Sequence, residues 1–131
     1  MRFESEGALK VLFAENGTQQ QLLATIDSMR HEALDDVARV VAALEFVMTH
    51  GPPYPDRIHQ SVLIHDLVLR INTAVIEWAD LTEQRVDGWP DLKPDDAMRA
   101  AAIDLVHELH QRSTAIAARH DTQPVSSTVA V

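Results

Sequence analysis

The chain has 131 residues, which is enough for one ordinary domain and too few for two separate cores. Its formal net charge of −9 opposes binding to nucleic acids, because that affinity comes largely from lysines and arginines that neutralise phosphates. No cysteine is present, which excludes disulfides, thiolate nucleophiles and cysteine metal sites, and is compatible with a reducing cytoplasm.

The sequence shows neither an export signal nor a membrane span. Glu4 and Glu6 stand where a signal peptide would carry positive charge, and no uncharged apolar run reaches the ~20 residues that cross a bilayer. We therefore expect a soluble, cytoplasmic protein. Its few glycines and prolines divide the chain into helical segments, so the predicted fold is all-α.

The first two predicted elements are a short helix over residues 5–15 and a long helix from Thr18 to about His50. Asn16 and Gly17 tolerate the left-handed conformation that ends a helix, and Thr18 followed by Gln21 has the spacing of a capping box. Apolar residues of the long helix recur at steps of three and four, close to a heptad repeat. At 1.5 Å per residue this helix is roughly 45 Å long, so we expect a second chain to cover part of it.

The third predicted helix follows the rigid proline-rich turn at residues 51–55 and runs from about Arg57 to Asp87. Asp56 is the candidate N-cap and Gly88 the candidate stop. Between Val62 and Leu81 apolar residues occur on nearly every side, a pattern typical of a helix buried all round, which one neighbouring helix cannot cover.

A fourth helix is predicted from about Asp95 to His120, with acidic residues at its start and a basic pair at its end. Residues 1–120 are then one helical domain, and residues 121–131 form a tail without helical periodicity that we expect to be disordered. The predicted architecture is a short helix, two long antiparallel helices and a C-terminal helix, forming an intertwined helical dimer.

Residues with catalytic potential form no recognisable motif. No serine lies in a nucleophile turn and no glycine-rich phosphate loop occurs, so we do not expect an enzyme and predict no cofactor. His107 and His110 do not have the spacing of a metal site, although a small metal-binding helical bundle that uses them with His65 remains an alternative.

Two sets of residues are candidates for binding. Trp78, His65 and Asn72 of the third helix are candidate ligand contacts, because a flat aromatic ring in a dimer cavity suits a planar aromatic molecule and a buried histidine or asparagine needs a polar partner. The alternative is that they serve packing and a structural polar network, in which Arg70 pairs with Asp66 four residues earlier on the same helix. The candidate dimer interface consists of Leu22, Ile26, Met29, Val37, Val40, Leu44, Leu67, Ile71 and Val75.

Two segments resemble the C-terminal region of PadR-like transcriptional regulators. In the first, the matching residues precede the long helix: Glu6, Leu9, Lys10, Val11, Phe13, Ala14, Gly17 and Thr18. In the second, they end the third helix: Trp78, Val86, Gly88 and Trp89. The resemblance covers residues 5–91, and the helix over 95–120 lies outside it.

The resemblance implies a homodimeric dimerisation and effector module, in which long helices of two subunits pack together and planar drugs or phenolic compounds bind in some members. The winged helix-turn-helix of that family has no counterpart in these residues, so we expect contact with DNA only through such a domain elsewhere. The alternative is a stand-alone interaction module that pairs with a full regulator.

Overall fold

The structure is a computed structural model that describes Gly7, Val11 and residues 17–122, with side chains as far as His120. The described residues form helices and no strand, which confirms the predicted all-α fold. The elements are α2 (Gln19–His50), the short 3₁₀ helix η2 (Pro55–Arg57), α3 (Ile58–Asp87) and α4 (Asp96–Thr122). Gly7 and Val11 are helical, whereas the rest of the short helix predicted over residues 5–15 lies outside the described residues.

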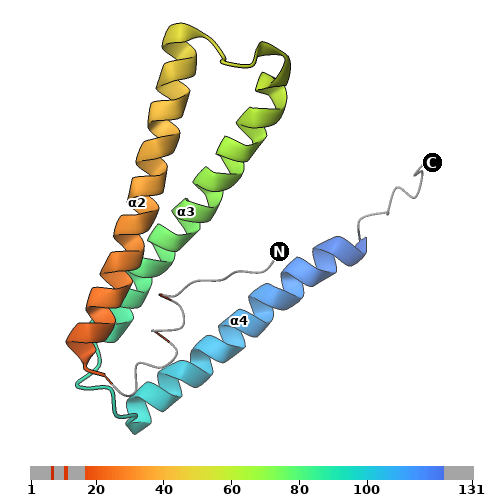
Figure 1. Cartoon of the computed structure of the whole chain (residues 1–131). Helices are drawn as coiled ribbons and strands as arrows, with labels where there is room; N and C mark the ends of the chain where they lie inside the picture. Colours follow the sequence, from red (N-terminus) through yellow and green to blue (C-terminus); the bar gives the residue numbers. More distant parts are fainter. Residues whose placement is uncertain (1–6, 8–10, 12–16, 123–131) are drawn as a thin grey trace. The chain divides into compact units, whose positions relative to one another are not determined.

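Two compact units make up the chain, Met1–Leu92 and Lys93–Val131. The first contains α2 and α3, which run antiparallel and side by side as a helical hairpin joined by the proline-rich turn (Figure 1). The second contains α4. That residues 1–120 form a single domain stays a prediction.

Helix α2 begins and ends with the local chemistry that its sequence predicts. The backbone N–H of Gln21 donates to the Thr18 hydroxyl at 3.1 Å, and the Thr18 N–H donates to the Gln21 side chain at 2.9 Å, which completes a capping box. At the other end Gly51 has φ of 81°, a conformation that L side chains rarely adopt, and its N–H donates to the Val47 carbonyl at 2.9 Å.

Helix α3 begins differently from the prediction. Asp56 does not cap it, because Pro55 fixes a helical φ and starts η2, so Asp56 already lies inside a helical turn. The N-cap position falls on Arg57, which forms no side-chain cap. At the C-terminal end α3 stops before Gly88, whose φ of −74° is right-handed, so this stop does not use the left-handed conformation.

The core of the hairpin lies at the end away from the turn. Leu22 and Ile26 of α2 are buried against Ala79 and Val86 of α3. Four partly buried apolar side chains pack on this cluster: Val11, Leu23, Trp89 and Leu92. Trp89 therefore closes the end of the hairpin, as a tryptophan just beyond a helix end is expected to do.

The half of the hairpin next to the turn has no buried residue. From position 41 to position 71 every side chain is exposed or half-buried, and the two helices diverge toward the turn (Figure 1). The hairpin by itself therefore does not bury α3 all round, and the part of the prediction that needs a second chain stays a prediction. Seven of its large apolar side chains are exposed: Val62, Leu63, Ile64, Leu67, Leu69, Trp78 and Leu81.

Helix α4 starts where its acidic residues predict. The Met98 N–H donates to the Asp95 carboxylate at 2.7 Å, so Asp95 caps the helix. The helix continues to Thr122, two residues beyond the predicted end, and its basic last turn contains Arg119 and His120. The tail from position 123 onward lies outside the described residues. Of the helices in the described part of the chain, none reaches the combination of length and apolarity that crossing a membrane requires.

Candidate functional site

Helix α3 carries one seam of side chains that faces α2. His65, Asn72, Ala79 and Val86 follow one another at intervals of seven residues, and the last three are buried. An interval of seven is close to two helical turns, so these residues share one side of the helix. This side supplies the contacts within the hairpin.

A second apolar seam follows a different side of α3, and we call it the α3 seam. Its residues are spaced by three and four in alternation: Ile64, Leu67, Ile71, Ala74, Trp78 and Leu81. Ile64 is 60% exposed, Leu67 45%, Trp78 38% and Leu81 47%. Ala74 is also exposed, and Ile71 is half-buried. This spacing is typical of a helix that packs against another helix.

The nine candidate interface residues differ in how deeply they are buried. Four of them are buried within the single chain: Leu22, Ile26, Met29 and Val40. Val37, Leu44, Ile71 and Val75 are half-buried, and Leu67 is exposed. The four buried residues thus belong to the core of one chain. The open surface includes residues that sequence reasoning did not select, of which Ile64 and Leu81 are the most exposed on the α3 seam.

The three candidate ligand residues do not converge in the described part of one chain. His65 and Asn72 lie on the side that faces α2, and the buried Asn72 amide donates to the Val68 carbonyl at 2.8 Å. Trp78 comes six residues after Asn72, which at about 100° per residue turns it roughly 120° away onto the α3 seam. A cavity of about 320 Å³ lies at the turn, and only residues 53–57 line it.

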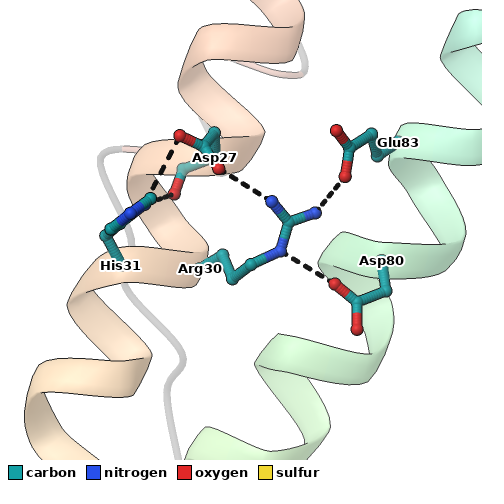
Figure 2. Close-up of polar contacts among 5 residues, drawn as sticks. All are labelled: Asp27, Arg30, His31, Asp80 and Glu83. Atoms are coloured by element: carbon teal, nitrogen blue, oxygen red, sulfur yellow. Dashed lines mark hydrogen bonds and ion pairs between the residues drawn. The ribbon is translucent and has the colours of Figure 1, made fainter.

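An ion cluster joins α2 to α3 near the packed end of the hairpin, and Figure 2 shows Arg30 at its centre. The Arg30 guanidinium donates to Asp27 at 2.7 Å, to Asp80 at 2.8 Å and to Glu83. The hydrogen bond to Glu83, followed by the bond to Asp80 and the charges of both carboxylates, raises the pKa of Arg30 above its ordinary value, while burial acts in the opposite direction. The His31 ring contacts the Asp27 carbonyl oxygen at 2.8 Å. The cluster links α2 to α3 in the register of this hairpin.

Sequence reasoning missed the Arg30 cluster but found a simpler pair. The partners of Arg30 on α3 are 50 and 53 residues away along the chain, and no local pattern connects them. The pair between Asp66 and Arg70, four residues apart, was predicted from helical spacing and is present at 3.1 Å. Both of its side chains are largely exposed.

The described residues contain no arrangement of side chains that could hold a metal ion. Across positions 7, 11 and 17–122, no group of three or more His, Asp or Glu side chains is placed to hold a metal ion. His107 and His110 are exposed on α4.

The surface that this structure offers is apolar and suited to a second helix. The α3 seam presents large aliphatic side chains and one tryptophan, with charged residues only along its flanks. Comparison of the chain with models of protein families, with curated proteins and with solved structures gave no match. The site is therefore interpreted from its own residues.

Proposed function

We propose that this chain is the dimerisation and effector-sensing module of a PadR-like transcriptional regulator and does not bind DNA by itself. The observation that carries the proposal is the α3 seam, an exposed apolar strip with the spacing of a helix–helix interface. The α2–α3 hairpin leaves it open, and a second copy is the partner that an intertwined helical dimer supplies.

Residues of the PadR-like pattern hold defined positions in the hairpin, which supports the proposal. Thr18 caps α2, Val86 is buried in the core, and Trp89 packs on that core. Trp78 lies on the α3 seam and is partly exposed. These residues therefore cap a long helix, fill the core of the hairpin and line its open side. Such positions suit a module built from paired long helices.

Sedimentation velocity at micromolar concentration tests the dimer. We expect a particle of twice the chain mass of 14.6 kDa, because burial of the α3 seam removes a continuous apolar strip from water. A matched Leu67→Lys variant places a charge in the middle of the seam and should shift the population toward the monomer. A wild-type chain that sediments as a monomer at this concentration contradicts the proposal.

Fluorescence of Trp78 tests the effector role. The chain has two tryptophans, so a Trp89→Phe variant reports on Trp78 alone. We expect a phenolic acid or a planar aromatic dye to quench this emission with a saturating curve, because the ring is partly exposed on the proposed dimer surface.

The matched Trp78→Phe variant retains only Trp89, which packs on the core, and should show no saturable quenching. Equal, non-saturating quenching in both variants would mean that Trp78 serves packing only, and that the effector part of the proposal is wrong.

A further inference from the structure

We propose that α3 pairs with α3 of a second copy in antiparallel orientation, through the α3 seam, and that Arg70 and Glu77 form reciprocal ion pairs across the two-fold axis. This inference rests on the proposed dimer and specifies its surface, orientation and register. It follows from the order of residues along one exposed side of α3.

The α3 seam is complementary to itself when it is reversed. If Ile71 is placed opposite Ala74 of the second copy, Leu67 comes opposite Trp78 and Ile64 comes opposite Leu81. Every layer then contains two apolar side chains, and the small Ala74 meets the branched Ile71 at the centre. In this antiparallel register each three-residue interval of one seam lies opposite a three-residue interval of the other, and each four-residue interval opposite a four-residue one.

The charges beside the seam fit the same register. Arg70 precedes Ile71 by one residue and Glu77 precedes Trp78 by one residue, so both flank the seam on the same side. Within one helix they are seven residues apart, roughly 10.5 Å along the axis, which is too far for an ion pair. In the antiparallel dimer Arg70 of each copy comes beside Glu77 of the other.

Both residues are available for this contact. Arg70 is 76% exposed at its side chain, and its present partner, Asp66, is itself 55% exposed, so exchanging or sharing that partner costs little. Glu77 is exposed and forms no ion pair with any residue in the described part of the chain. A parallel pairing of the same seam would instead place Arg70 beside Val75 of the second copy and leave both charges unpaired.

The open apolar positions on α2 do not offer an equivalent. Leu34, Val41 and Met48 are exposed at intervals of seven residues. The exposed flanking positions in the same register are Ala38 and Glu45, which give no pair of opposite charges when α2 is reversed on itself. Charge complementarity therefore selects the α3 seam for the second copy.

Two charge reversals test the register. Glu77→Arg places arginine at both flanking positions, and Arg70→Glu places glutamate at both, so each homodimer gains like charges where the wild type has opposite ones. We expect the dimer dissociation constant of each variant, measured by sedimentation equilibrium, to rise roughly tenfold. An equimolar mixture of the two restores opposite charges at all four positions, so native mass spectrometry should show heterodimer above the statistical half.

A Glu45→Arg variant is the matched control for Glu77→Arg, because it makes the same substitution at an exposed position outside the α3 seam. Its dissociation constant should stay within about twofold of the wild type, and circular dichroism should show equal helicity in all variants. If the wild type is a dimer but neither reversal weakens it and the mixture shows no preference, the α3 register is wrong while the dimer stands. A monomeric wild type overturns both.

Discussion

Arg30 forms contacts with three carboxylates, and this makes its charge important to the hairpin. Its side chain is 16% exposed, whereas the side chains of Asp27, Asp80 and Glu83 are about half exposed. Water therefore screens the carboxylates in part, and the cluster stabilises less than a buried one would. Without the cation, however, three negative charges would remain side by side.

Replacement of Arg30 by methionine should lower the free energy of unfolding by about 1–2 kcal/mol, because it removes the cation and leaves the carboxylates to repel one another. Urea denaturation at a fixed protein concentration measures this loss. The matched variant is Arg39→Met, which breaks one exposed pair with Asp36 inside α2 and should cost about 0.5 kcal/mol or less. Equal losses in the two variants would show that the cluster adds nothing beyond an ordinary surface pair.

The same cluster determines the pH range in which the Arg30 charge stabilises the hairpin. The pKa of Arg30 is higher in the folded chain than in the unfolded one, so its contribution to stability is fully present at any pH below the unfolded value. That contribution is lost only as the pH rises through the still higher folded pKa. Arg30 therefore remains charged through neutral and moderately alkaline solution.

At the residue scale, the sequence predicted contacts between neighbours and missed contacts across the hairpin. The capping box of Thr18 and Gln21 and the pair of Asp66 and Arg70 involve residues three or four apart, so helical spacing is enough to find them. The Arg30 cluster requires the register of α2 against α3, which no local pattern fixes. Its carboxylates were therefore not recognised as partners.

At the scale of the helices, prolines and glycines made the boundaries predictable. The long helices begin and end within about two residues of the predicted positions, because Gly51, the following prolines and Gly88 interrupt the helical backbone. Asp56 was assigned wrongly because Pro55 starts a 3₁₀ turn before α3, a geometry that a search for N-cap residues does not anticipate.

The two seams of α3 explain why the hairpin alone leaves much of this helix exposed. Apolar residues on nearly every side predict a helix buried all round, but most of them fall into two sets, and the exposed Val62 and Leu69 belong to neither. His65, Asn72 and Ala79 belong to the side that faces α2, while Leu67 and Trp78 belong to the open side. The apolar character of a side chain does not tell which helix covers it, nor whether that helix belongs to the same chain. The residues that face α2 recur every seven positions, whereas the α3 seam alternates intervals of three and four on another side of the helix. This difference in position along the sequence could have separated the two sets.

At the scale of the whole chain, the net charge of −9 predicts the absence of intrinsic DNA binding. We expect no retardation of duplex DNA in a gel-shift experiment at physiological salt, and none when the salt is lowered, because dilution of counterions strengthens only contacts made by a basic surface. Retardation that weakens as salt is added would contradict this prediction and would point to a local basic patch that outweighs the total charge.

The position of the core affects how the hairpin folds. The Gln19 side chain and the Val86 carbonyl, which meet at the packed end, are 67 residues apart along the chain. A helical hairpin can form from the turn outward, but here no side chain next to the turn is fully buried, so the first steps gain little apolar burial. Closing a loop of this length costs about 2 kcal/mol more in chain entropy than closing one the size of the turn. A lone chain therefore gains most of its apolar burial from its most distant contacts, whereas a partner on α3 would hold the open half in place while the ends meet.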